Sequence, residues 1–136
     1  MNETLKKILY VDDEQDIRMI ATMVLEKKAG IEVIPHESGA SALDYIKGLD
    51  HADTPDLILL DVMMPGMDGP QTLEHIKEHD SHPISDVPIV FLTAKCQPYE
   101  VERLKSLGAT DVIAKPFDVH NFSEQLITIY ANQKPT

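Results

Sequence analysis

Five short apolar runs alternate with segments whose apolar residues recur at helical spacing, and this alternation constrains the fold more than any other feature. The runs are rich in β-branched and aliphatic residues and cover 8–11, 31–34, 57–60, 89–92 and 112–114. The third run is apolar at every position, as expected for a central strand covered on both faces. Strand–helix alternation repeated five times predicts a doubly wound α/β domain, in which helices cover both faces of one parallel sheet.

Periodicity, breakers and caps indicate where the five helices lie. The expected apolar stripes are Ile17, Ile20, Ala21, Val24 and Leu25; Ala42, Leu43 and Ile46; Leu73 and Ile76; Val101, Leu104 and Leu107; and Phe122, Leu126 and Ile129 or Tyr130. We expect Gly30, Gly48 and Gly108 to end the first, second and fourth helices. Asp68, followed by Pro70, and Asp118 are expected to cap the third and fifth. Residues 79–88 are interpreted as an extended loop, and 132–136 as a frayed tail.

The length and composition predict a single cytoplasmic domain. The 136 residues suffice for one core, expected over about 6–131 of a domain spanning 1–136, and no apolar run is long enough to cross a membrane. The single cysteine, Cys96, fits a reducing compartment. A formal net charge of −11 argues against direct binding of nucleic acid and favours a cation or a basic partner surface.

Polar residues stand where four of the five predicted strands end. These residues are Asp12 and Asp13 after the first run, Asp61 after the third, Thr93 after the fourth and Lys115 after the fifth. In an open parallel sheet the carboxyl ends of the strands form the ligand-binding edge. The sequence therefore predicts that these five side chains share one site.

The chemistry of this set suggests phosphoryl transfer. Neighbouring carboxylates repel one another, and a bound cation relieves that repulsion; oxygen ligands combined with phosphate favour Mg²⁺. A lysine ammonium and a threonine hydroxyl suit phosphoryl oxygens. An aspartate can be the nucleophile that becomes an aspartyl phosphate. A carboxylate such as Asp61, directly after a buried run, would be costly to place there without partners.

At this point the chain resembles the response-regulator receiver domains of two-component signalling systems. The motifs that carry the resemblance are ILYVDDE at 8–14, LILLDVMMPGMDG at 57–69, PIVFLTA at 88–94 and GATDVIAKPF at 108–117. Together they span nearly the whole chain. The resemblance implies the flavodoxin-like (βα)5 fold with strand order 2-1-3-4-5.

The resemblance also implies roles for the site residues. Asp61 would be the phosphoacceptor and Asp13 a direct Mg²⁺ ligand, with Asp12 acting through water. The backbone carbonyl of Met63 would complete the metal site, with Asp61 as a further ligand. Thr93 would contact a phosphoryl oxygen.

On the other side of the same site, Lys115 would pair with the phosphoryl group, and the Lys115–Pro116 peptide bond would be cis. The implied phosphodonor is a histidine kinase or a histidine phosphotransfer protein. The downstream protein target, or a second copy in a homodimer, would bind the face formed by 98–107, the fifth strand and the last helix. Such a domain is primarily a signalling switch that catalyses its own phosphorylation and dephosphorylation.

One position departs from the family pattern. Receivers often carry an aromatic residue three positions before the lysine, and here that residue is Val112. A valine has no large alternative rotamer, so coupling between Thr93 and an aromatic side chain is in question. The output face would then respond through backbone shifts.

Several other functions can be weighed against this one. A phosphohydrolase of the haloacid-dehalogenase type needs an acid two residues after its nucleophile, where this chain has Met63. A flavin carrier needs a first loop that binds phosphate, whereas the corresponding loop here, residues 12–16, is acidic and would repel it. The zinc-peptidase pattern HxxEH at 75–79 is more simply a solvated helix face. A receiver cut from a longer regulator, or a receiver-like module that binds partners without phosphate, also stays open.

Overall fold

The computed structural model describes residues 4–79 and 82–133 as one layered α/β domain. Its strands are β1 (Lys7–Val11), β2 (Glu32–His36), β3 (Leu57–Asp61), β4 (Ile89–Thr93) and β5 (Asp111–Ala114). Its α-helices are α1 (Gln15–Ala29), α2 (Gly39–Lys47), α3 (Gly69–Lys77), α4 (Pro98–Ser106) and α5 (Phe122–Gln133). Two short 3₁₀ helices, η1 (His51–Asp53) and η2 (Pro83–Asp86), precede β3 and β4.

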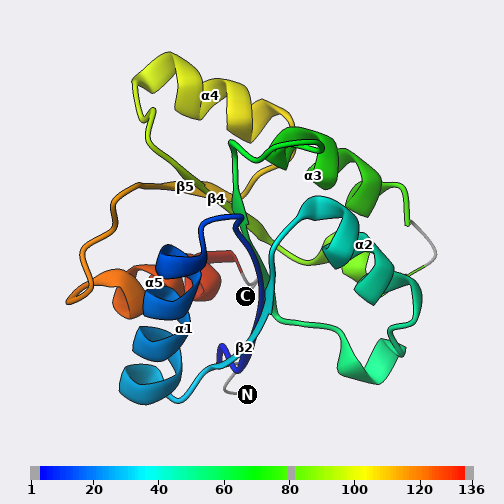
Figure 1. Cartoon of the computed structure of the whole chain (residues 1–136), viewed down its shortest axis with the longest axis horizontal. Helices are drawn as coiled ribbons and strands as arrows, with labels where there is room; N and C mark the ends of the chain where they lie inside the picture. Colours follow the sequence, from blue (N-terminus) through cyan, green and yellow to red (C-terminus); the bar gives the residue numbers. More distant parts are fainter. Residues whose placement is uncertain (1–3, 80–81, 134–136) are drawn as a thin grey trace.

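The five strands form one parallel sheet in the order β2-β1-β3-β4-β5, which confirms the predicted flavodoxin-like topology. Figure 1 shows the sheet between two helical layers, with α1 and α5 on one side and α2, α3 and α4 on the other. The second strand lies on one side of β1, and the third strand lies on the other side, so β1 and β3 are neighbours. This arrangement brings the ends of β1 and β3 together.

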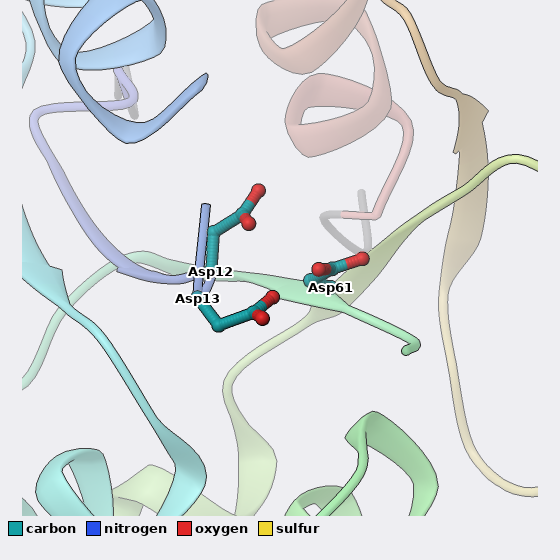
Figure 2. A group of neighbouring side chains, drawn as sticks. All are labelled: Asp12, Asp13 and Asp61. Atoms are coloured by element: carbon teal, nitrogen blue, oxygen red, sulfur yellow. The ribbon is translucent and has the colours of Figure 1, made fainter. Parts of the chain in front are cut away.

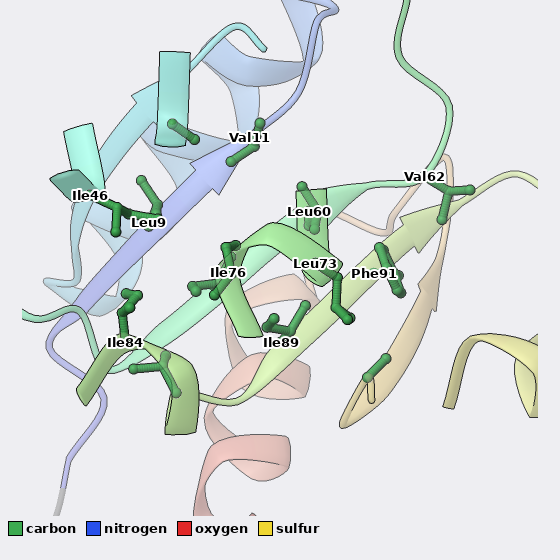
Figure 3. Close-up of a cluster of buried hydrophobic side chains, with 14 of the residues drawn as sticks. Leu9, Val11, Ile46, Leu60, Val62, Leu73, Ile76, Ile84, Ile89 and Phe91 are labelled. Atoms are coloured by element: carbon green, nitrogen blue, oxygen red, sulfur yellow. The ribbon is translucent and has the colours of Figure 1, made fainter. Parts of the chain in front are cut away.

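The apolar run in β3 divides its side chains between the two layers. All five residues of β3 are buried. Ile58 and Leu60 pack in the cluster under α2, α3 and α4, which Figure 3 shows. Leu57 and Leu59 pack in the opposite cluster, under α1 and α5. Alternation along one strand therefore explains why an uninterrupted apolar run is needed at the centre of the sheet.

Helix ends follow the predicted caps in two clear cases. Gly30 adopts a left-handed conformation (φ 66°), and its N–H donates to the carbonyl of Glu26, which ends α1. At the start of α3, Asp68 and Gln71 form a reciprocal capping box. Gly48 also follows α2 as expected, but with φ −99° it does not use left-handed geometry.

Several boundary predictions need correction. Ile31 is not part of β2, because its N–H closes the end of α1 on the carbonyl of Leu25. In the predicted extended loop 79–88, residues 83–86 form η2, started by Pro83 and capped by the ring of His82. The predicted frayed tail begins too early, since α5 continues to Gln133; residues 80–81 and 134–136 lie outside the described residues.

Two predicted core positions are exposed instead. Ile20 on α1 is 42% exposed, and Leu107 just after α4 is 44% exposed. Among the stripe of α4 the buried residue is Leu104. The expected cap of α5 is also displaced: Asp118 accepts from the N–H of His120 and stabilises a turn, and the helix begins four residues after it.

No helix in the two described ranges, 4–79 and 82–133, combines the length and hydropathy that a membrane crossing requires.

Candidate phosphoacceptor site

The predicted site residues meet at the carboxyl edge of the sheet. Asp12 and Asp13 follow β1, and Asp61 is the last residue of β3. One carboxylate oxygen from each of these three side chains lies within 4.8 Å of the others. Figure 2 shows Asp12 and Asp13 leaving the same segment in different directions, with Asp61 beside them on the neighbouring strand.

Asp12 is the most enclosed member of this acidic cluster, with no exposed surface. Its Oδ2 accepts a 2.8 Å hydrogen bond from the hydroxyl of Tyr10, and its Oδ1 accepts one of 3.0 Å from the backbone N–H of Glu14. Its backbone carbonyl accepts a 2.7 Å bond from the guanidinium of Arg18. Asp12 therefore links the end of β1 to the start of α1 through both its side chain and its backbone carbonyl.

Lys115 supplies the positive charge that faces these carboxylates. Its Nζ lies 3.2 Å from Oδ2 of Asp12, 3.2 Å from Oδ2 of Asp61 and 2.6 Å from Oε1 of Glu14. Burial by itself lowers the pKa of Lys115, but the three carboxylates outweigh it and the net shift is upward. The Lys115–Pro116 peptide bond is cis, as the resemblance implied.

The carboxyl of Asp61 is the group whose ionisation is made harder by burial and by the neighbouring charge. Burial, followed by the nearby charge of Asp12, raises the pKa of its carboxyl to about 7, although Lys115 acts in the opposite direction. The carboxyl of Asp61 is therefore harder to ionise than that of a solvated aspartate, and added positive charge nearby would favour its ionised form. The all-oxygen donor set, three carboxylates of which Asp12 and Asp61 are buried, fits a hard divalent cation.

Thr93 and Met63 occupy different parts of the same edge. Thr93 ends β4 and is 3% exposed, and its hydroxyl oxygen accepts a 3.0 Å hydrogen bond from the backbone N–H of Lys95. Met63 is 70% exposed in the loop that follows Asp61. Its backbone carbonyl as a metal ligand stays a prediction.

Sequence reasoning missed two contacts of the site. It gave no role to Tyr10, whose hydroxyl bonds Asp12, or to Glu14, which makes the shortest contact of Lys115. The alternation of side chains along a strand could have revealed the first, because residues 10 and 12 point to the same face of β1. Within the described residues, the His, Cys, Asp and Glu side chains that converge as possible metal ligands are those of the aspartate cluster, and His75 instead pairs with Glu78 at 3.3 Å.

The fold and this edge together define a flavodoxin-like α/β domain with a cluster of aspartates opposed by Lys115. The chain belongs to the response regulator receiver domain family, whose sequence profile matches residues 8–127. It is therefore a receiver domain of two-component phosphorelay signalling.

Individual relatives agree with this assignment. Sporulation initiation phosphotransferase F of Bacillus subtilis is 36% identical over 119 residues, covering 88% of this chain and 86% of that protein. The phosphate regulon transcriptional regulatory protein PhoB of Escherichia coli is 38% identical over 112 residues, covering 82% of this chain and 46% of PhoB. The structure of the chemotaxis response regulator CheY4 of Vibrio cholerae superposes with a TM-score of 0.80 at 29% identity, covering 93% of this chain and 99% of CheY4.

The chain spans about half the length of the transcriptional regulators that it matches, between 43% and 53% of each.

Proposed function

We propose that this receiver accepts a phosphoryl group on Asp61 in a Mg²⁺-dependent reaction and thereby changes its affinity for a protein partner. The observation that carries the proposal is the position of the Lys115 ammonium, 3.2 Å from both Asp61 and Asp12. A lysine held between a nucleophilic carboxylate and an acidic cluster can neutralise charge on an incoming phosphoryl group.

Four residues would hold the cation. Asp13 and Asp61 are proposed as direct ligands, Asp12 as a ligand through water, and the backbone carbonyl of Met63 as a further ligand. When bound, Mg²⁺ would neutralise charge on the carboxylates and on the phosphoryl oxygens. The pKa of Asp61, raised by burial and by Asp12, supports a site in which added positive charge favours the ionised carboxylate.

The covalent step is a displacement at phosphorus. A carboxylate oxygen of Asp61 would attack, forming a P–O bond while the P–N bond to the donor's phosphohistidine breaks, and the electron pair would stay on the imidazole nitrogen. Lys115 and the hydroxyl of Thr93 would contact the phosphoryl oxygens. Water would later reverse the modification by hydrolysing the aspartyl phosphate. We propose a histidine kinase or a histidine phosphotransfer protein as donor, and a cytoplasmic location for this domain, by analogy with the family.

Thr93 offers a route from the site to the partner-binding face. Its hydroxyl accepts from the N–H of Lys95, in the loop that leads into α4 at Pro98. A phosphoryl oxygen that forms a hydrogen bond with the Thr93 hydroxyl would change the conformation of this loop. Through the loop it would change the face formed by α4, β5 and α5. Val112 on β5 packs into the cluster under α2, α3 and α4, which fits a response carried by backbone rather than by an aromatic rotamer.

Phosphorylation by a small donor tests the proposal directly. The protein would be incubated with acetyl phosphate, with and without Mg²⁺, and its intact mass measured beside Asp61→Asn and Asp44→Asn. Asp44 is an exposed carboxylate paired with Lys47 and serves as the matched control. We expect one phosphoryl group, gained only with Mg²⁺ and absent in Asp61→Asn. A folded wild-type protein that gains nothing would contradict the proposal and leave a receiver that binds partners without phosphate.

A further inference from the structure

Tyr10 lies wholly inside the core, yet its hydroxyl reaches the acidic cluster. Its relative exposure is 0%, and it belongs to the apolar cluster under α1 and α5 together with Phe122 and Leu126. From there its hydroxyl donates a 2.8 Å hydrogen bond to Oδ2 of Asp12. A core side chain is thus joined directly to the functional edge.

The surroundings of Tyr10 fix the direction of this hydrogen bond. Tyr10 sits in β1, which is flanked on both sides, with Pro35 of β2 and Leu59 of β3 as its register partners. A ring packed between a sheet and two helices cannot change rotamer without displacing its neighbours. The hydroxyl is therefore a fixed donor at the oxygen that it contacts.

The Asp12 carboxylate depends on a small number of donors for its orientation. Oδ2 takes the Tyr10 hydroxyl and lies 3.2 Å from Nζ of Lys115, while Oδ1 takes the backbone N–H of Glu14. Without Tyr10, the contact from the core would be lost, and Lys115 and Glu14 N–H would be left to set the orientation of the carboxylate. That orientation also sets how Asp12 holds Lys115.

We propose that Tyr10 is a positioning residue, whose hydroxyl holds Asp12 in the orientation that the divalent-cation site requires. This inference rests on the proposed function, because it assigns Tyr10 a role toward the cation that Asp12, Asp13 and Asp61 would bind. Partners that orient metal-binding carboxylates change metal affinity by roughly 10- to 100-fold when they are removed. We expect an effect near the lower end, since Asp12 keeps its other donors.

The experiment compares Tyr10→Phe with wild type in Mg²⁺ titrations followed by thermal unfolding. Tyr130→Phe is the control, because it removes a hydroxyl from another buried tyrosine of the same cluster. We expect the Mg²⁺ concentration at the midpoint of the stabilisation to rise roughly tenfold in Tyr10→Phe and to stay unchanged in Tyr130→Phe. The chain has no tryptophan, so tyrosine absorbance gives a second readout. The Mg²⁺-dependent change in that absorbance should be lost with Tyr10.

The rate of phosphorylation by acetyl phosphate separates positioning from a general structural role. A positioning role predicts that Tyr10→Phe reacts slowly at low Mg²⁺ and recovers most of the wild-type rate at saturating Mg²⁺. Equal Mg²⁺ midpoints for Tyr10→Phe and wild type would overturn the role of Tyr10 while leaving the proposed function intact. A wild-type protein that neither responds to Mg²⁺ nor gains a phosphoryl group would overturn both.

Discussion

The ammonium nitrogen of Lys115 lies 3.2 Å from a carboxylate oxygen of Asp61, although β4 separates their strands in the sheet. The lysine follows β5 and extends across the end of β4 to reach the aspartate. This contact requires the attraction between the Lys115 ammonium and the carboxylates to outweigh the hydration that the ammonium loses. Asp61 nevertheless keeps a pKa raised to about 7 by burial and by Asp12, so one lysine does not neutralise the site.

The first prediction concerns the charge on Asp61 in the absence of Mg²⁺. The folded protein holds this carboxyl with a pKa of about 7, whereas its ordinary value is 3.8. The stability contributed by the protonated form is thus present below about pH 4 and is lost as the pH rises through 7. Asp61→Asn cannot ionise and should raise the free energy of unfolding at about pH 8 by roughly 2 to 4 kcal/mol.

Urea unfolding across this pH range provides the check. The gain from Asp61→Asn should shrink steadily toward about pH 4 and should also shrink when Mg²⁺ stabilises the wild type. Asp44→Asn, at an exposed position, should change stability by less than about 0.5 kcal/mol. A variant that is less stable than wild type at high pH would show that the ion pair with Lys115 outweighs the crowding of acids.

Much of the fold and of the site could be predicted from the sequence because the strands are short and strongly apolar. Each predicted strand was found, and the polar residues at the ends of four of them marked the functional edge. Asp61 is the clearest case: a carboxylate that directly follows a buried run has to lie at the end of a central strand. The order of the strands came from the resemblance, since periodicity alone does not set it.

The features that escaped prediction depend on side-chain reach in three dimensions. The contact of Lys115 with Glu14 joins residues 101 positions apart, and no local pattern encodes it. The 3₁₀ turn at Pro83 is stabilised by the His82 ring, which also contacts the carbonyl of Leu49 at 3.1 Å. The exposure of Ile20 shows that helical spacing predicts a face but not how much of it a neighbouring helix covers.

A second prediction concerns the hydroxyl of Thr93. Thr93→Val keeps the shape of the side chain but leaves the N–H of Lys95 without its 3.0 Å acceptor. Losing one hydrogen bond of this kind costs about 1 kcal/mol, so amide exchange at Lys95 should accelerate roughly fivefold. Thr93→Ser retains the acceptor and should exchange like wild type. Unchanged exchange in Thr93→Val would mean that the loop is held by other contacts.

A third prediction uses His36 at the end of β2. Burial lowers the pKa of its ring, and the nearby charge of Glu37 has a smaller effect in the opposite direction. The ring nitrogen Nδ1 lies 2.7 Å from the hydroxyl oxygen of Ser41. The centroids of the His36 and Tyr45 rings are 5.1 Å apart. Because the folded-state pKa is below the unfolded value of 6.5, protonation favours unfolding. The stability held by neutral His36 is therefore present above about pH 6.5 and is lost as the pH falls below it.

The comparison that tests it is His36→Gln against wild type between about pH 7 and pH 5. Wild type should lose stability relative to the variant as the pH falls, because the variant has no ring to protonate. His120→Gln, at an exposed position, should leave the pH dependence unchanged. A stability difference between His36→Gln and wild type that does not vary with pH would contradict the assignment.

The last prediction concerns the close packing behind the site at Gly69, the first residue of α3. A Cβ at this position would overlap the backbone carbonyl of Asp61 and lie 2.8 Å from the ring of Phe91 and 2.9 Å from Cα of Val62. Gly69 also donates a 2.8 Å hydrogen bond to the carbonyl of Val62. Backbone atoms cannot give way as a flexible side chain can, so the strand end that carries Asp61 would have to move.

Gly69→Ala should therefore destabilise the protein by about 3 kcal/mol and weaken Mg²⁺ binding as well, because it displaces a proposed ligand of the cation. Thermal unfolding in a Mg²⁺ titration measures both effects at once. Gly48→Ala is the matched control: an added Cβ meets nothing within 4 Å, and φ is −99°, so stability should be unchanged or rise by up to about 1 kcal/mol. If Gly69→Ala lowered stability but left the Mg²⁺ midpoint at the wild-type value, the packing behind β3 would matter for folding alone and the position of Asp61 would tolerate the shift.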